Sequence, residues 1–253
     1  MKLKSYGSLA WTERVISSLG EYEEEVRQSI TTLERYRGGE RKTMLHLGCG
    51  AGGHDYHFKN SFQITGVDIS EEMLGMARER NPEVHYIQGD MRNVRLNQKF
   101  DVVVIPDSIA YMNTLEDLKK AIQTAAYHLR SGGIFLVVVH TKEEFTNNNF
   151  VYTGTDGDIH ITLFENNYII SESQYEAAMV YLIRQNGKLQ IEHDVHTLGL
   201  FSHETWLEQL TAARLFINET RNMNELYDRY LLEEGEYKLK VYVCTPITCE
   251  GMR

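Results

Sequence analysis

Three short motifs in the first half of the chain place glycines and carboxylates where a nucleoside can bind. A glycine-rich run, Gly48-Cys-Gly-Ala-Gly-Gly53, follows one apolar segment, Asp68 follows a second and Asp90 follows a third. A buried strand that ends in glycines lets the chain turn tightly and brings bare backbone amides close to a ligand. Asp68 comes 68 − 48 = 20 residues after Gly48, a spacing at which a carboxylate can accept hydrogen bonds from ribose hydroxyls. Together the motifs predict a nucleoside site.

The glycine run alone does not identify the nucleoside, because Gly48-x-Gly50-x-x-Gly53 also fits the dinucleotide fingerprint. In that fingerprint a pyrophosphate lies at the N-terminus of the following helix. Asp90 favours a different ligand, since after the expected strand Val84–Gln88 its carboxylate can accept a hydrogen bond from an adenine amino group. Three apolar side chains are placed to hold the adenine ring, namely Ile69, Met73 and Met91. This combination indicates S-adenosylmethionine (SAM).

The order of these motifs, from about residue 43 to residue 140, resembles that of the class I SAM-dependent methyltransferases. Two runs, Ser-Glu-Glu-Met-Leu at 70–74 and Gln-Gly-Asp-Met-Arg at 88–92, are similar to small-molecule members such as the deoxyamino-sugar N-methyltransferases. The resemblance is good over roughly the first two thirds of the chain and loose over the remainder. It implies SAM as cofactor, S-adenosylhomocysteine as product and a small polar metabolite as acceptor. It also implies that the backbone of Gly48, Cys49 and Gly50 lies along the methionine part of SAM.

One residue departs from the family pattern. His46 stands two positions before the glycine turn, where the family usually has an acidic residue that helps to organise the loop. Either a neutral imidazole or an ordered water takes over that role, or the cofactor is bound more weakly.

Composition limits the classes of protein to consider. With 253 residues, of which 42% are hydrophobic, the chain is long enough for one α/β domain with an added element. Its formal charge of −10 repels phosphate backbones and anionic membranes, so we expect neither nucleic acid nor a membrane as partner. Three cysteines suggest no disulfide framework, and the sequence has no export pattern at its N-terminus. We therefore expect a cytoplasmic protein, with its oligomeric state left open.

Apolar segments that alternate with helical ones predict a Rossmann-like α/β fold. The strands expected in the first part of the chain are 43–47, 64–67, 84–88, 100–105 and 134–140. Capping signals place one helix at Ser70–Arg80 and another at Leu115–Leu129, the latter ending at the turn Ser131-Gly132-Gly133. Two later strands, at 216–220 and 238–245, complete a mostly parallel seven-stranded sheet flanked by helices.

Two segments stand outside this alternation. Residues 1–42 carry apolar side chains at helical spacing, and we expect them to form a helical lid. Residues 145–200 alternate polar and apolar side chains around the hairpin signal Asn186-Gly187, which predicts an antiparallel insert after the fifth strand. The predicted organisation is a lid at 1–42 and a methyltransferase domain at 43–253 that includes a substrate-binding insert at 145–200. Which insert side chains face the acceptor depends on strand register.

Methyl transfer from a sulfonium needs an oriented acceptor, and it needs a base only where the acceptor is protonated. Open sheets bind ligands beyond the carboxyl ends of their strands, which is where Pro106, Asp107 and Tyr111 follow the fourth strand and His140 ends the fifth. Asp107 can orient or deprotonate the acceptor, or cap the next turn. Tyr111 can line the pocket or pack in the core. His140 can act as a base near neutral pH, or be a hydrogen-bonded histidine at a strand end.

The lid and the remaining histidines leave further alternatives. Tyr6 and Trp11 can face the sulfonium through cation–π attraction, or only pack the lid. No metal site is expected. His193 and His196 point to opposite faces of a strand, and His54 and His57 lack a clear third ligand.

Other functions compete with that of a small-molecule methyltransferase. An NAD-linked oxidoreductase of the common short-chain type would carry a Tyr-x-x-x-Lys pair, which the sequence lacks. An RNA methyltransferase is disfavoured by the acidic charge. Base-methylating enzymes end the fourth strand with Asn or Asp before Pro-Pro-Tyr, whereas this chain has Pro106-Asp107-Ser108. A non-catalytic SAM-binding protein stays open as an alternative.

Overall fold

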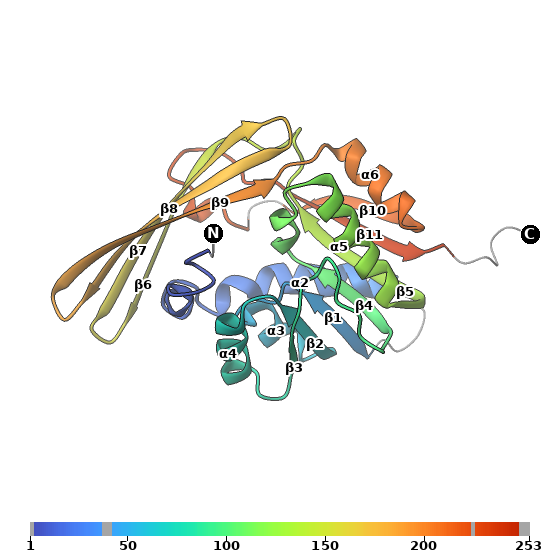
Figure 1. Cartoon of the computed structure of the whole chain (residues 1–253), viewed down its shortest axis with the longest axis horizontal. Helices are drawn as coiled ribbons and strands as arrows, with labels where there is room; N and C mark the ends of the chain where they lie inside the picture. Colours follow the sequence, from blue (N-terminus) through green and yellow to red (C-terminus); the bar gives the residue numbers. More distant parts are fainter. Residues whose placement is uncertain (1–2, 37–41, 224–225, 248–253) are drawn as a thin grey trace, which may run out of the picture.

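The computed structural model describes residues 3–36, 42–223 and 226–247. Its centre is a seven-stranded sheet with the strand order β10-β11-β5-β4-β1-β2-β3. All pairs among β1 to β5 are parallel, whereas β11 pairs antiparallel with both β5 and β10. A second sheet, β6-β7-β8-β9, is antiparallel and extends to one side of the molecule (Figure 1). The expected fold class, a mostly parallel Rossmann-like sheet with an antiparallel insert after the fifth strand, is confirmed.

The helices, including three short 3-10 helices (η), are η1 (Ala10–Thr12), α1 (Glu13–Ile16), α2 (Gly20–Arg35), α3 (Gly53–Phe58), α4 (Glu71–Arg80), η2 (Ser108–Tyr111), α5 (Leu115–His128), α6 (His203–Ala212) and η3 (Asp228–Tyr230). The strands of the main sheet are β1 (Thr43–Leu47), β2 (Gln63–Asp68), β3 (His85–Gln88), β4 (Phe100–Ile105), β5 (Leu129–Val139), β10 (Leu215–Met223) and β11 (Leu239–Pro246). The insert consists of β6 (Asn148–Asp156), β7 (Ile159–Ser171), β8 (Gln174–Gln185) and β9 (Lys188–Gly199).

The junction of α5 and β5 differs from the sequence prediction. The helix stops at His128, and Leu129 already pairs with Phe100 of β4. The glycines expected to form a free turn at 131–133 therefore lie inside β5, where Gly132 adopts a φ of 71° and the β4–β5 register shifts. Leu129 is buried, and burying an apolar side chain favours pairing over an exposed turn.

Helices pack on both faces of the main sheet. Apolar side chains of α5 and α6, such as Leu118 and Trp206, pack on one face. Those of α2, α3 and α4, such as Val26 and Phe58, pack on the other. This arrangement leaves the carboxyl ends of the parallel strands as the edge at which loops, lid and insert meet (Figure 1).

The N-terminal segment packs against the insert. Leu9, Val15 and Ile16 form one apolar cluster with side chains of β7 and β8. The approach is close, because a Cβ added to Gly154 of β6 would lie 1.8 Å from the Val15 carbonyl oxygen. The predicted domain boundaries stay a prediction, but lid and insert are in direct contact.

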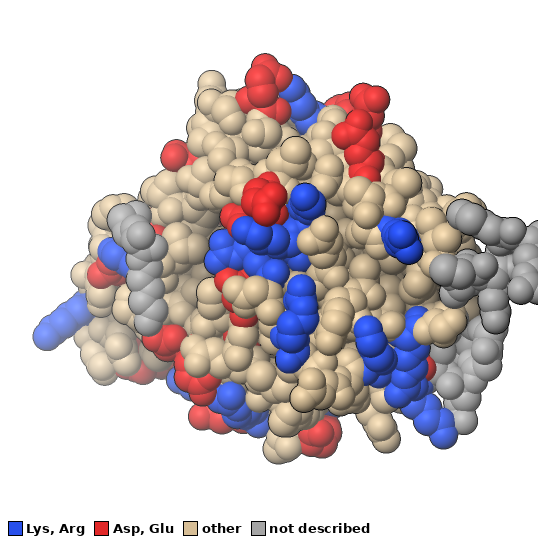
Figure 2. Space-filling model, turned by 45° about the vertical axis from the view of Figure 1, so that its right-hand side comes forward, with Lys and Arg blue, Asp and Glu red and all other residues tan. Residues whose placement is uncertain are grey.

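On the face shown in Figure 2, Lys and Arg side chains of the described residues lie in groups among Asp and Glu side chains. None of the described helices is both long and apolar enough to cross a membrane.

Candidate active site

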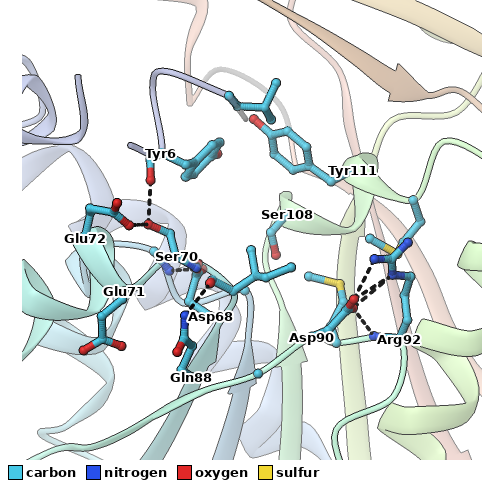
Figure 3. A pocket seen from close by; sticks show the side chains of 17 residues that line it. Tyr6, Asp68, Ser70, Glu71, Glu72, Gln88, Asp90, Arg92, Ser108 and Tyr111 are labelled. Carbon is cyan, nitrogen blue, oxygen red and sulfur yellow. Dashed lines mark hydrogen bonds and ion pairs between the residues drawn. The ribbon is translucent and has the colours of Figure 1, made fainter. Parts of the chain in front are cut away.

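A cavity of about 460 Å³ opens at the carboxyl ends of β1, β2 and β3 (Figure 3). We call it the cofactor cavity. Eight residues singled out from the sequence line it: Tyr6, Gly48, Gly50, Asp68, Ile69, Asp90, Met91 and Tyr111. Sequence reasoning missed the other nine, which are Leu3, Ser70, Glu71, Glu72, Gln88, Gly89, Arg92, Ser108 and Met112. Most of these nine are sequence neighbours of a predicted site residue. Their position close to the end of a strand was therefore the sequence signal that could have identified them.

In the glycine turn after β1, position 48 accepts only glycine, the residue without a side chain. Gly48 has a φ of 75°, and a Cβ there would lie 2.2 Å from Ser108 Oγ and 2.8 Å from Met91 Cε. The amides of Gly48 and Cys49 donate to the Val67 carbonyl at 2.7 and 3.1 Å. The turn is therefore fixed to β2 and presents bare backbone to the cavity.

Asp68 connects the first two loops. Its Oδ2 accepts from the Gly50 amide at 2.8 Å, and its Oδ1 accepts from the Ser70 amide at 2.9 Å. Burial raises the pKa of this carboxyl, although these amides act in the opposite direction. Ser70 also donates through its hydroxyl to the Tyr6 carbonyl at 2.6 Å. The acid thus positions both loops and connects them to the lid while lining the cavity.

The acid missing from β1 is supplied by the helix that follows it. His46 Nδ1 lies 2.7 Å from Asp55 Oδ1 of α3, and both side chains are buried. Asp55 Oδ2 accepts from the Tyr86 hydroxyl at 3.0 Å. Asn81 donates to that hydroxyl and to the Gly52 carbonyl. The buried His46–Asp55 pair thus reaches the glycine loop through Tyr86 and Asn81, which fits the alternative in which an imidazole takes over the organising role.

Asp90 is not free to act alone on an adenine amino group. Arg92 donates to both of its carboxylate oxygens, at distances of 2.6 to 3.0 Å, and its guanidinium also reaches Asp117 at 3.3 Å (Figure 3). Asp90 accepts the Arg92 amide as well. Any adenine contact must use a remaining lone pair of this carboxylate.

Four predicted cofactor residues lie outside the cavity lining. Cys49 is buried, and burial raises its pKa, so the thiol stays protonated. Met73 packs with Ala10 and Ala51, and Pro106 is buried behind the β4 end. Trp11 packs with the apolar cluster between lid and insert. These positions favour packing roles over direct contacts.

Asp107 occupies a strained position after β4. Asp107 has a φ of 55° and a ψ of −42°, and the Ser108 amide donates to the Pro106 carbonyl at 2.6 Å. This geometry is a γ-turn of the rare, strained form. Its side chain makes no capping hydrogen bond, so the capping role considered from the sequence is not seen. Strained turns of this kind cluster at functional sites.

His140 lies opposite Asp107. Its Nε2 is 3.8 Å from Asp107 Oδ1 and 2.8 Å from the Tyr237 hydroxyl. Burial lowers the pKa of His140, although Asp107 acts in the opposite direction. Burial likewise raises the pKa of Asp107, while His140 opposes this shift. The pair joins the ends of β4 and β5.

Tyr111 and His196 form a connection that sequence reasoning missed. The Tyr111 hydroxyl lies 2.8 Å from His196 Nδ1, and His196 Nε2 lies 3.0 Å from Asp194 Oδ2. Asp194 also accepts from the amide and hydroxyl of Ser5 on the lid. The ring of Tyr6 meets that of Tyr111 edge-on at 5.3 Å (Figure 3). His196 therefore anchors a pocket tyrosine, and no cluster of three metal-ligating groups occurs among the described residues.

The arrangement fits an adenosyl ligand with a charged sulfur centre. Bare amides, a loop-bound acid and apolar side chains line one cavity, and tyrosine rings close its end toward Asp107.

Comparison with known proteins agrees with this assignment. Residues 44–133 match the family model described as "Methyltransferase domain". A dTDP-3-amino-3,4,6-trideoxy-alpha-D-glucopyranose N,N-dimethyltransferase of Streptomyces venezuelae is 32% identical over 190 residues, covering 74% of this chain and 80% of the relative. A dTDP-3-amino-3,6-dideoxy-alpha-D-glucopyranose N,N-dimethyltransferase of Streptomyces fradiae is 27% identical over 192 residues, covering 74% and 75%.

Two solved structures resemble the whole chain. Streptomyces venezuelae DesVI superposes with a TM-score of 0.75 at 26% identity, covering 95% of this chain and 96% of that one. SAM-bound CalS10 from Micromonospora echinaspora, described as an amino pentose methyltransferase, has a TM-score of 0.74 at 20% identity with the same coverage and supports the fold.

Proposed function

We propose that an amine is the methyl acceptor of this chain, which belongs to the SAM-dependent methyltransferases, and that amino sugars are the acceptor class to test first. Transfer of a methyl group from SAM to a small polar metabolite agrees with every relative named above. Those relatives give no support to an oxidoreductase, an RNA methyltransferase or a non-catalytic protein. Two of them act on dTDP-linked amino sugars by name, which supports nitrogen over oxygen. Cytoplasmic location stays a prediction.

The observation that carries the proposal is the Asp107–His140 pair. Aliphatic amines resemble the lysine side chain, with a pKa of about 10.4, so at neutral pH they are ammonium ions without a free lone pair. A carboxylate next to a neutral imidazole can bind the ammonium and take up its proton. Burial lowers the pKa of His140 and so favours its neutral form.

The proton and the methyl group then move in a balanced sequence. One ammonium proton passes to the Asp107–His140 pair. The freed lone pair forms the new N–C bond as the C–S bond breaks, and the electrons of that bond go to sulfur. SAM supplies the methyl group on a sulfonium, and S-adenosylhomocysteine and an N-methylammonium are the products. A second transfer requires a second deprotonation.

Asp68, the glycine turn and the cavity lining hold SAM in this proposal. Asp68 accepts from the ribose hydroxyls through lone pairs not used by the Gly50 and Ser70 amides. Gly48 and Gly50 approach the methionine part, and Ile69 and Met91 flank the base. Tyr6 and Tyr111 close the cavity toward Asp107, where an aromatic face stabilises a nearby cation.

The test replaces Asp107 by asparagine, which removes the charge and keeps the size. We expect kcat with an amino-sugar acceptor to fall by about 10²- to 10⁴-fold, the range for a lost acid–base group, while SAM affinity by calorimetry stays within about twofold. Asp158→Asn in the exposed β6–β7 turn is the matched control and should leave both unchanged. Products made with ¹³C-methyl SAM locate the methyl group by NMR. Methyl found on oxygen, or an unchanged kcat, would rule the proposal out.

A further inference from the structure

Three polar side chains run in series from the insert to the cofactor cavity: Asp194 and His196 of β9 and Tyr111 of η2. We infer that Asp194 and His196 are positioning residues, which fix the Tyr111 hydroxyl as a hydrogen-bond acceptor at the end of the cavity that receives the sulfonium of SAM. Tyr111 lines the cavity and the other two lie behind it, so they act through Tyr111. The inference rests on the placement of SAM in the proposed function, but not on the choice of nitrogen as methyl acceptor.

The carboxylate of Asp194 sets the direction of the series. Asp194 is buried, and its Oδ2 lies 3.0 Å from His196 Nε2. Although burial raises the pKa of Asp194, hydrogen bonds from the Ser5 amide and from His196 outweigh this effect and lower the pKa below its usual value. At neutral pH the carboxylate is therefore ionised, and an ionised carboxylate can only accept hydrogen bonds. The proton between Asp194 and His196 must belong to Nε2.

A proton on Nε2 decides which way the hydrogen bond to Tyr111 runs. In a neutral imidazole one ring nitrogen carries the proton and the other accepts, and the partner of the first sets the state of the second. Nδ1 of His196 then has a free lone pair, and it lies 2.8 Å from the Tyr111 hydroxyl. The hydroxyl donates to Nδ1. Its proton points to His196, so the lone pairs of the Tyr111 oxygen are left for the cavity.

Tyr111 lies at the end of the cavity opposite the adenine residues. The four strands that support the cavity are ordered β4-β1-β2-β3. Asp90 follows β3, Asp68 follows β2 and Gly48 follows β1, whereas Tyr111 belongs to η2 after β4. A SAM molecule with its adenine at Asp90 and its ribose at Asp68 carries its sulfur beyond the ribose, on the side of β1 and β4. Tyr111 lines the cavity on that side, together with Ser108 (Figure 3).

An oxygen lone pair at this end favours SAM over S-adenosylhomocysteine. The sulfur of SAM is positively charged, and a dipole fixed in advance with its negative end toward a charge stabilises that charge without having to reorient. The C–H groups next to a sulfonium are polarised and can make weak hydrogen bonds to oxygen. S-Adenosylhomocysteine has neither the charge nor the transferable methyl group. A Tyr111 hydroxyl with its proton toward the cavity would lose this preference.

The same carboxylate also holds the lid. Asp194 Oδ2 accepts from the Ser5 amide at 2.8 Å and from the Ser5 hydroxyl at 2.9 Å. The next lid residue, Tyr6, lines the cavity, and its ring centroid lies 5.3 Å from that of Tyr111 and 5.8 Å from that of His196. Because Ser5 binds Asp194 directly, the contact that holds the lid can be separated from the contact that orients Tyr111.

The experiment uses two variants of His196 that each keep one of its contacts. A glutamine amide can reach the position of Nε2, so His196→Gln keeps the contact with Asp194 and leaves the Tyr111 hydroxyl without its acceptor. An asparagine amide takes the position of Nδ1, so His196→Asn keeps an acceptor for Tyr111. Calorimetry on the full chain measures the dissociation constants of SAM and S-adenosylhomocysteine.

We expect His196→Gln to weaken SAM binding about two- to fivefold more than S-adenosylhomocysteine binding, the range for one weak C–H···O hydrogen bond. His196→Asn should preserve the ratio of the two dissociation constants. The matched control is His193→Gln, at an exposed position of the same strand, which should leave both constants unchanged.

A double-mutant cycle separates positioning from packing. Tyr111→Phe keeps the ring and removes the hydroxyl, so it should reduce the preference for SAM by the same factor as His196→Gln. Residues that act through one another are not additive, and His196→Gln should therefore add nothing in the Tyr111→Phe protein. NMR of the chain with ¹⁵N-labelled histidine should show His196 with a proton on Nε2 and none on Nδ1.

Three results would overturn the inference. They are equal weakening of SAM and S-adenosylhomocysteine by His196→Gln, additive effects in the double variant, and a proton on His196 Nδ1. If the His196 variants do not fold, Tyr111→Phe decides alone, because an unchanged ratio of the two dissociation constants contradicts the role of the hydroxyl. Failure of the proposed function is read elsewhere: nitrogen as acceptor from the position of the ¹³C-methyl group, and the placement of SAM from Asp68→Ala.

Discussion

The cofactor cavity and the region around Asp107 and His140 are built differently. The cofactor cavity uses the ends of neighbouring strands, backbone amides and short connections such as those from Asp68 to Gly50 and Ser70. The region around Asp107 and His140 uses side chains from the β4 end, the β5 end and the segment before β11. A site made of backbone tolerates little change, whereas one made of side chains on separate segments can change its ligand while the fold stays constant.

This difference predicts that variants on the cofactor side weaken SAM binding with every acceptor, and that variants on the acceptor side alter turnover without changing SAM affinity.

The largest effect concerns the support of the glycine loop. His46→Leu leaves the buried Asp55 carboxyl without its imidazole partner, and loss of one member of such a buried pair typically costs about 3–5 kcal/mol. We expect urea unfolding to show this loss, with SAM affinity reduced as well. Exchanging the two residues, His46→Asp with Asp55→His, should recover part of the stability. Full stability of His46→Leu would show that the pair does not support the loop.

Gly48→Ala comes next. The positive φ costs about 1–2 kcal/mol for any L side chain, and overlap with Ser108 and Met91 adds about 1–3 kcal/mol. Calorimetry should show SAM binding weakened by roughly 30-fold or more. The matched control is Gly75→Ala on α4, where nothing lies within 4 Å of the added Cβ. That change should leave SAM affinity intact and add about 0.5–1 kcal/mol of stability.

Asp68→Ala removes a carboxylate that holds two loops. Hydrogen bonds to a charged group contribute about 1.5–3 kcal/mol, so SAM should bind roughly 10- to 150-fold more weakly. Turnover at saturating SAM should change much less. An unchanged dissociation constant would contradict the assignment of Asp68 to the ribose.

The smallest effect is a pH shift on the acceptor side. His140 is faced by Asp107, Tyr237, Tyr175, Phe145 and the Lys238 backbone. Since burial lowers its pKa from 6.5, its neutral form persists below that value, and the acid limb of the kcat profile should lie below pH 6.5. Asp107→Asn removes a carboxylate that raises the pKa of His140, so the residual activity should show this limb at still lower pH.

The same shift has a consequence for stability. The folded protein binds fewer protons at His140 than the unfolded chain does between the lowered pKa and 6.5, so stability contributed by this group is lost as the pH falls through that window. His140→Gln should flatten the pH dependence of the urea midpoint there. An acid limb above pH 6.5 that is unaffected by Asp107→Asn would argue against His140 as part of the proton acceptor.

How far the sequence predicts the structure differs between the two regions. Asp68 and the glycine turn were predictable, because their roles depend on position directly after a buried strand. Arg92 was missed, although it follows Asp90 by two residues, because a carboxylate's partner depends on side-chain direction. His196 carried no signal of its role beside the cavity, since its partner Tyr111 lies 85 residues away in the chain (196 − 111 = 85).

The sequence by itself determined the class of fold, the order of the strands along the chain and the edge of the sheet at which the glycines and acids meet. Periodicity, glycines and acids at strand ends report contacts that a segment makes with its near neighbours, and these can be read in one dimension. Only the tertiary structure decided that Asp55 supplies the acid absent at His46, that Asp107 sits on a strained turn facing His140, and that His196 of the insert anchors Tyr111. Those features arise when segments far apart in the chain pack together, and their geometry depends on register and side-chain direction that no local pattern encodes.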